Sequence, residues 1–163
     1  MTIKYVTRSV IALALVAFGA TSAQAQTANQ TVTFAVNAIN QIAFVGAPSL
    51  TITTAVAGSA PTSATDNTAS WAVTTNQTGA KITASIPSIM PAGLTLSSNL
   101  TAPTGGASAG FQALGTTAVD LVTGITKLAQ GALGVTYKLD ATVAAGVVAS
   151  GTKVVTYTIT GGT

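Results

Sequence analysis

The sequence alternates apolar and polar side chains with a period of two, and this feature constrains the fold more than any other. In Val135–Val143 the apolar residues occupy every second position, and Thr136, Lys138 and Asp140 lie between them. Such a period places the two sets of side chains on opposite faces of a β-strand. Lys138 and Asp140 are predicted to form a solvated pair on the outer face, which contributes little to stability. The chain is therefore predicted to form half-buried strands.

The same alternation recurs in short segments that are separated by turn-forming residues. Threonine, whose branched Cβ favours strands, makes up 27 of the residues from 26 to 163. The predicted strands are residues 31–36, 39–45, 49–54, 69–75, 81–86, 94–100, 111–114, 135–143 and 153–160. About 7–9 short strands with regular turns indicate an all-β, immunoglobulin-like Greek-key β-sandwich.

Several connections carry more specific predictions. Asn76–Gly79 is predicted to close a hairpin between segments 69–75 and 81–86. Segment 102–110, rich in Gly, Ala and Ser, is predicted to be a surface loop. Residues 116–128 are predicted to form a strand and a turn, and a helix is the alternative.

The first 25 residues have the pattern of a cleavable secretion signal. Lys4 and Arg8 give a positive start, and Val10–Ala20 is apolar. Residues 23–25, Ala-Gln-Ala, then match the small-residue pattern that a signal peptidase cleaves. A retained membrane anchor is the alternative, but about 11 apolar residues fall short of the roughly 20 that a membrane-spanning helix needs. We therefore expect a secreted, extracellular or cell-surface protein with one mature domain, residues 26–163.

The predicted mature chain carries few charges. Its charged side chains are Lys81, Lys127, Lys138, Lys153, Asp66, Asp120 and Asp140. This is far below the roughly 25% of charged residues in ordinary soluble domains. A nucleic-acid partner would require clustered Lys and Arg, whereas a surface with few charges has little protection against self-association. The composition favours other copies of the chain as partners, and it disfavours nucleic acid.

The residue types that most catalytic and metal sites require are missing. Residues 26–163 contain no Arg, Glu, His or Cys. Serine–histidine triads and the usual zinc sites need His or Cys, and the three aspartates lie far apart in the sequence. We expect no catalytic residue, no cofactor, no metal site and no enzymatic activity. A polysaccharide-active enzyme that uses aspartates is the alternative in this class.

Trp71 is the aromatic residue considered for ligand binding. Its ring is either a platform on which a sugar stacks or a core side chain between the sheets. Val73 lies on the same predicted face, and this favours the core.

The segment 31–36 poses a choice between two folds. Val32, Phe34 and Val36 point to one face of the predicted strand. An N-terminal strand can detach without unthreading a domain, complete the sheet of a neighbouring subunit and fill alternate side-chain pockets there. These three residues are then the inserted side chains of a donor strand. The alternative is that 31–36 is the first strand of its own sandwich.

Three features resemble the secreted β-sandwich subunits that build bacterial and archaeal pili, matrix fibres or coats. They are the signal ending at residues 23–25, the early strand 31–36 and the closing strand 154–160. The resemblance implies self-assembly. The chain differs from chaperone–usher pilins because it has no disulfide and continues past the last strand with Gly161-Gly162-Thr163.

Together these observations predict a secreted structural subunit that assembles into an extracellular filament or surface layer, with donor-strand exchange as the mechanism. A monomeric secreted adhesin or carbohydrate-binding module is the alternative.

Overall fold

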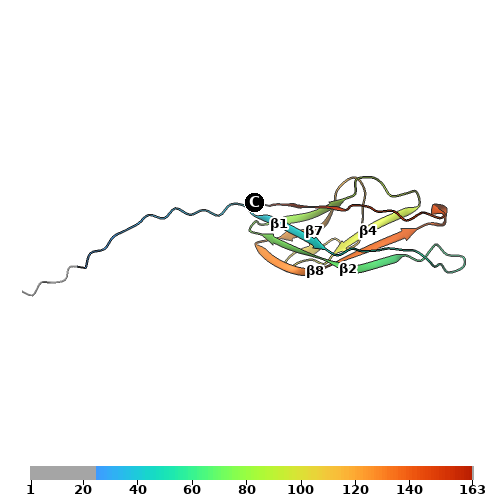
Figure 1. Ribbon diagram of the computed structural model, residues 1–163, viewed down its shortest axis with the longest axis horizontal. Helices are drawn as coiled ribbons and strands as arrows, with labels where there is room; N and C mark the ends of the chain where they lie inside the picture. Colours follow the sequence, from blue (N-terminus) through green and yellow to red (C-terminus); the bar gives the residue numbers. More distant parts are fainter. Residues whose placement is uncertain (1–24, 163) are drawn as a thin grey trace, which may run out of the picture. The chain divides into compact units, whose positions relative to one another are not determined.

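The computed structural model describes residues 25–162. The predicted signal peptide therefore lies outside the described residues, apart from Ala25. The chain divides into two units, Met1–Ala35 and Val36–Thr163. The described residues of the first unit, 25–35, contain no helix or strand, and the strands belong to the second unit (Figure 1).

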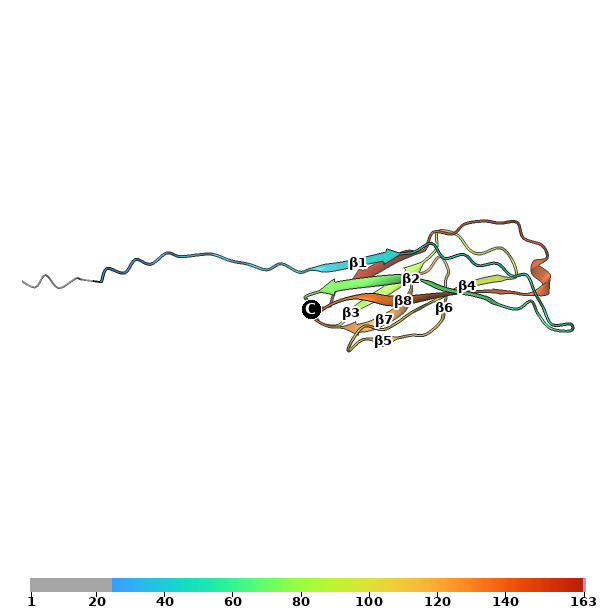
Figure 2. The ribbon, with the colours of Figure 1, turned by 60° about the horizontal axis from the view of Figure 1, so that its bottom comes forward.

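The second unit consists of two antiparallel sheets, the layering of a β-sandwich (Figure 2). The first sheet has the order β1-β2-β8-β4-β6, and the second has the order β5-β7-β3-β9. The strands of the first sheet are β1 (Asn40–Val45), β2 (Ala64–Thr75), β8 (Leu128–Ala141), β4 (Leu94–Leu100) and β6 (Gln112–Ala113). Those of the second are β5 (Ala107–Ser108), β7 (Val119–Ile125), β3 (Ala80–Ser85) and β9 (Thr156–Thr160). A 3-10 turn, Val143–Ala145, follows β8. The prediction of an almost all-β chain is confirmed.

The core lies between the sheets and is filled by the alternating residues of the central strands. Ile82 and Ala84 of β3 are buried while Lys81 and Thr83 are half-buried. The other buried apolar side chains come from both sheets and their connections: Ala69, Trp71, Val73, Ala80, Ile86, Leu96, Leu100, Leu114, Leu121, Val122, Ile125, Leu133, Val135 and Tyr137. The period-two pattern thus identifies the inward face of most strands.

The predicted hairpin across Asn76–Gly79 is wrong. β2 pairs with β1 and β8, whereas β3 pairs with β7 and β9. The short connection carries the chain from one sheet to the other, because the apolar faces of β2 and β3 both point to the core between the sheets. Alternation shows which side of a strand is buried, but it does not show which strand is the partner.

The predicted strand at 49–54 is also absent. β1 ends at Val45, and Gly46 follows with φ +113°, a conformation that favours glycine. A Cβ at Gly46 would also collide with the backbone of Ala69 in β2. Pro48 then lacks a backbone N–H. This turn ends the backbone pairing of the chain with β2, so Leu50 and Ile52 keep an alternating, half-buried pattern outside both sheets.

Other segments follow the predictions more closely. Residues 116–128 contain β7 and a turn: Gly124, at φ +75°, lies within β7 where the register with β3 shifts, and Lys127, at φ 44°, lies in the turn before β8. The predicted loop 102–110 contains only the two-residue strand β5. Residues 111–114 contain β6, which forms the edge of the first sheet.

β1 and β9 are edge strands on the same side of the two sheets. The Phe44 ring of β1 stacks on the Tyr157 ring of β9, with centroids 3.9 Å apart and an angle of 14° between the planes. At one end of these strands Gly161 passes so close to Asn40 and Gln77 that a Cβ would collide with both side chains. The two edges are therefore in contact where β1 begins and β9 ends.

Candidate functional site

The N-terminal segment 31–36 exposes the side chains that its sequence pattern marks as apolar. Val32 is 72% exposed, Phe34 89% and Val36 80%. These residues belong to no strand, and β1 begins only at Asn40. Residues 26–39 also contain no charged side chain. The chain thus presents a strand-like apolar face without a partner strand in the part that the structure describes.

Asn76 holds the chain just before β1. Its side-chain Oδ1 accepts a hydrogen bond from the Ile39 N–H at 2.8 Å, and its Nδ2 donates to the Asn37 carbonyl at 2.7 Å. The Asn76 backbone N–H donates to the Ile39 carbonyl at 3.2 Å. These bonds prolong the pairing of β1 with the end of β2, so the chain enters the first sheet in a fixed direction.

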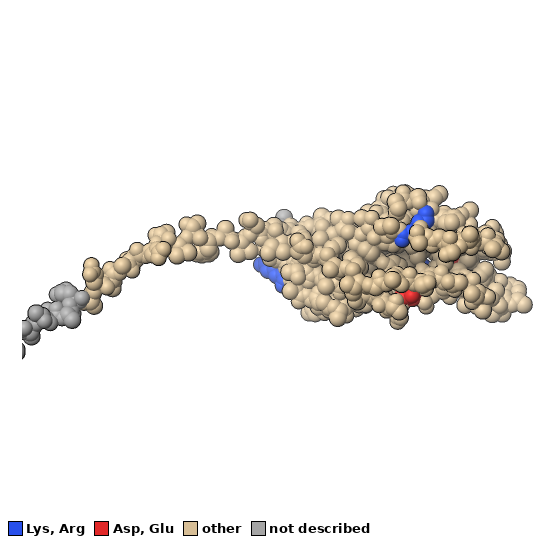
Figure 3. All heavy atoms as spheres, in the orientation of Figure 1, with Lys and Arg blue, Asp and Glu red and all other residues tan. Residues whose placement is uncertain are grey.

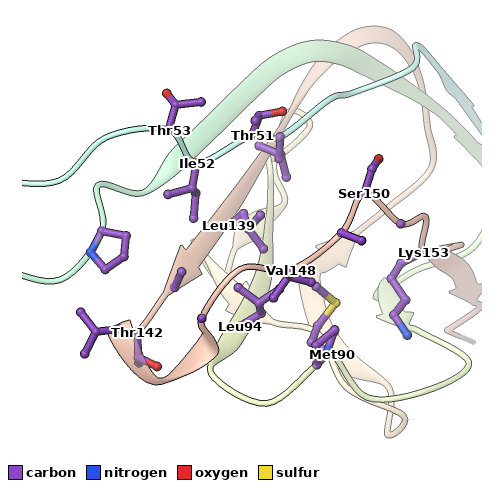
Figure 4. Close-up of a pocket in the computed structure, with 18 of the residues that line it drawn as sticks. Thr51, Ile52, Thr53, Met90, Leu94, Leu139, Thr142, Val148, Ser150 and Lys153 are labelled. Atoms are coloured by element: carbon purple, nitrogen blue, oxygen red, sulfur yellow. The ribbon is translucent and has the colours of Figure 1, made fainter.

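A groove opens on the side of the sandwich where the two sheets have their edges β1 and β9. It consists of two adjoining cavities of about 630 and 750 Å³ that share lining residues, among them Leu50, Met90 and Leu139. Packing voids in protein cores are rarely larger than a water molecule, so a hollow of this size is a surface feature of the fold. We call it the edge groove (Figure 4).

Two extended segments form the walls of the edge groove. One wall is 50–53, which follows β1, and the other is 148–153, which precedes β9. Among the described residues, neither segment makes a backbone–backbone hydrogen bond. Each wall therefore offers unpaired N–H and C=O groups, the feature that makes an uncovered sheet edge a template for another strand.

The floor of the edge groove is apolar. Leu94 and Leu96 of β4 and Leu139 of β8 line it, together with Met90. In Figure 4 the Ile52 and Leu139 side chains approach from different elements, and Val148 lies near Met90. Leu139 and Met90 are only partly buried. A strand between the walls would cover these side chains.

A tyrosine pair joins the two sheets at the end of the groove near β1. The Tyr137 and Tyr157 hydroxyl oxygens are 2.7 Å apart, and the Tyr157 hydroxyl lies 3.1 Å from Ser98 Oγ. Burial raises the pKa of both hydroxyls, most strongly that of Tyr157. Both rings stay neutral at physiological pH, and the network ties β9 to β8 and β4.

Charged groups are sparse, and most of them form ion pairs or hydrogen bonds. Figure 3 shows a face on which charged atoms occupy only isolated spots. Lys81 pairs with Asp120 at 2.9 Å, and Lys138 pairs with Asp140 at 3.0 Å, as predicted for the latter. Such partly exposed pairs contribute little to stability.

Asp66 of β2 binds the backbone of Ser49, the residue that follows Pro48. Its carboxylate accepts hydrogen bonds from Thr68 Oγ1, from the Thr68 N–H and from the Ser49 N–H. These bonds, the Thr68 hydroxyl first, lower the pKa of the Asp66 carboxyl. Asp66 therefore anchors one end of the wall 50–53 to β2. The anchor lies where the register of β2 with β8 shifts, between Asp66 and Ala69.

Lys153 is the charged residue that lines the edge groove. Its Nζ donates to Ser88 Oγ at 2.8 Å and to the Ile89 carbonyl at 3.0 Å. Lys153 follows Ser150 with the Ser-x-x-Lys spacing of some acyl-transfer enzymes, but these two bonds connect it to another segment. They fasten the wall 148–153 to the connection between β3 and β4.

Trp71 lies in the core and is 1% exposed. Its ring is parallel to that of Phe44 within 12°, with centroids 6.0 Å apart. A ring buried to this extent has no face open to a sugar. Its Nε1 has no hydrogen-bond partner among the described residues. Sequence alternation anticipated the burial of Trp71, but it gave no signal for the edge groove.

Within residues 25–162 no three His, Cys, Asp or Glu side chains come close enough to hold a metal ion. The described part of the chain also contains no helix with the length and apolarity needed to cross a membrane.

No protein-family model, curated protein or solved structure matches this chain.

Proposed function

We propose that the protein is a secreted structural subunit that assembles with copies of itself into an extracellular filament or surface layer. The proposal places the N-terminal strand of one copy in the sheet of the next. It includes the predictions of a secretion signal in residues 1–25 and of an immunoglobulin-like Greek-key order of strands.

One observation carries this proposal. Val32, Phe34 and Val36 alternate along an uncharged segment, and each is at least 72% exposed. Burying an apolar side chain of this size stabilises a protein by about 1.5–3 kcal/mol. Three such side chains, exposed in a strand-forming pattern, would therefore gain free energy if a partner surface buried them.

The rest of the chain supports an open-ended assembly. Contacts between a terminal strand on one copy and a different surface on the next are heterologous, and such contacts produce filaments when they do not close into a ring. Few charged groups oppose close approach, because the mature chain has only seven charged side chains. The monomeric carbohydrate-binding alternative has less support, because Trp71 is buried.

Assembly of the purified mature protein, residues 26–163, tests the proposal. Light scattering and negative-stain electron microscopy are expected to show filaments or sheets that grow with protein concentration. The triple variant V32S/F34S/V36S is expected to stay monomeric, because it removes the apolar face without shortening the chain. The matched control T31S/T33S/A35S changes the other face of the same segment and is expected to assemble.

A wild-type protein that remains a monodisperse monomer at millimolar concentration would overturn the proposal. Equal assembly by V32S/F34S/V36S and the wild type would show that self-association uses another surface.

A further inference from the structure

We infer that the edge groove is the acceptor site, and that its occupant is the segment 31–36 of a second copy of this chain. This inference rests on the proposed function and specifies the partner surface that the proposed function leaves open.

The backbone of the edge groove matches an inserted strand. The walls 50–53 and 148–153 are extended and have no backbone–backbone partners among the described residues. Six extended residues span about 20 Å, which is the length of both the wall 148–153 and the segment 31–36. An inserted strand can therefore pair along its whole length with the wall 148–153 and along part of its length with the four-residue wall 50–53, which is the β-strand addition seen in peptide recognition.

The side chains match as well. In a strand inserted between the walls, every second side chain points inward, so Val32, Phe34 and Val36 would point to the floor together. The floor offers the apolar surfaces of Leu94, Leu139 and Met90. No charge has to be desolvated, because segment 31–36 has none and Lys153 is already hydrogen-bonded to Ser88 and to the Ile89 carbonyl.

The occupant is a second copy because residues 37–39 cannot reverse freely. Asn76 fixes them at the Asn40 end of β1, whereas the wall 50–53 lies beyond the Val45 end. The six residues of β1 span about 20 Å. For self-insertion, the same chain would have to turn back across the residues that Asn76 holds. Insertion between copies leaves these hydrogen bonds intact and extends the assembly by one subunit at each step.

Cysteine cross-linking tests the inference directly, because the chain has no native cysteine. One protein carries a donor cysteine, V32C, F34C or V36C. The other carries a wall cysteine, I52C or V148C, or the control T123C on an exposed position of β7. A disulfide requires Cα atoms within about 7 Å, so mild oxidation of mixed proteins reports which surface the donor segment reaches.

We expect covalent heterodimers for at least one donor with I52C or V148C, and at least tenfold less product with T123C. Double variants that carry a donor cysteine and a wall cysteine in the same chain, such as F34C/V148C, are also made for every donor–wall pair. At least one of these is expected to give a ladder of multimers on a non-reducing gel.

Three results would overturn the inference. Filaments that form without any donor–wall cross-link would place the acceptor elsewhere and leave the proposed function intact. Cross-linked monomers without a ladder would assign the groove to the chain's own segment. A wild-type protein that forms no assembly at all would remove the proposed function together with this inference.

A peptide provides a readout that needs no assembly. A synthetic peptide of residues 29–38 is added to the full-length mature variant V32S/F34S/V36S, whose own donor face is disabled. We expect saturable binding at one peptide per chain and a rise of about 5 °C in the thermal midpoint at high peptide excess. The further substitution L139K, which places a charge in the floor, is expected to abolish binding. Peptide binding that survives L139K in a folded protein would contradict the assignment of the floor.

Discussion

The segment 31–36 and the strand β9 are nearly equivalent in sequence but have opposite environments. Both alternate threonine or a small residue with apolar side chains, and each has an aromatic residue on the apolar face, Phe34 or Tyr157. Tyr157 is half-buried, stacks on Phe44 and lies on a strand paired with β3. Phe34 is 89% exposed.

The comparison separates the capacity to form a strand from the presence of a partner. A period of two makes an apolar face available, but backbone pairing and burial depend on a neighbouring edge. β9 has that edge within its own domain. We propose that segment 31–36 finds it in the edge groove of another copy.

Truncating the two aromatic residues should give the largest contrast. Tyr157→Ala is expected to lower the free energy of unfolding by about 3 kcal/mol, because it removes the stacking on Phe44 and leaves a cavity. Phe34→Ala is expected to change the unfolding of the unassembled chain by less than about 0.5 kcal/mol, while it weakens assembly. Urea denaturation at a concentration below assembly measures both. Equal destabilisation by both variants would place Phe34 in its own core.

Alkaline pH should destabilise the folded domain through the tyrosine pair that ties β9 to β8. Burial raises the pKa of Tyr137 and Tyr157 above the value of about 10 that tyrosine has in an unfolded chain. The folded state therefore keeps protons that the unfolded state releases, so stability is intact below pH 10 and is lost as the pH rises above it. Thermal unfolding from pH 8 to 12 measures the loss. The variant Y137F/Y157F should lose this dependence. An unchanged alkaline loss in that variant would exclude the tyrosine pair as its cause.

The junction between segment 31–36 and β1 offers a smaller effect. Asn76→Ala removes the side-chain bonds to Ile39 and Asn37, and it is expected to cost about 1–2 kcal/mol of unfolding free energy. The control Asn67→Ala, at an exposed position of β2, should change stability by less than about 0.5 kcal/mol. Denaturant titration compares the two variants. Equal costs would mean that Asn76 does not hold the chain before β1.

Acid should have the smallest effect, through the carboxylate that fastens the wall 50–53. Hydrogen bonds lower the pKa of Asp66 below its ordinary value of 3.8. The stabilisation is therefore present above about pH 4 and is lost as the pH falls through the lowered pKa. Because the position is exposed, we expect the thermal midpoint to change by only about a few degrees. Asp66→Asn should reduce the fall of the thermal midpoint between pH 5 and 2, and the part due to Asp140, whose pKa is also lowered by hydrogen bonds, should remain. A profile identical to the wild type would exclude Asp66 as the titrating group.

The sequence predicts the faces of strands better than their partners. The alternation in β8 and around Trp71 identifies buried residues correctly, because burial of one face of a strand places apolar residues at every second position. The hairpin across Asn76–Gly79 fails because a short connection serves equally well within a sheet and between sheets. Partner choice is a tertiary property and leaves no trace in the period.

The edge groove was harder to predict for a related reason. Leu50, Ile52 and Leu139 have the pattern of ordinary core residues, and only the path of the backbone leaves them half-covered. The local cause is visible in the sequence as Gly46 and Pro48, which interrupt the alternation. Their effect on the sheet edge depends on how closely Gly46 approaches Ala69. Any Cβ at position 46 would collide with Ala69, and the sequence alone does not show this contact.

Amide hydrogen exchange of residues 31–36 tests the central claim most directly. In the assembled mature protein, these amides are expected to be protected to about the same degree as those of β9, and in the monomeric variant V32S/F34S/V36S they should exchange at the rate of an unstructured chain. Rapid exchange of residues 31–36 within well-formed assemblies would contradict the claim that this segment completes the sheet of a neighbouring copy.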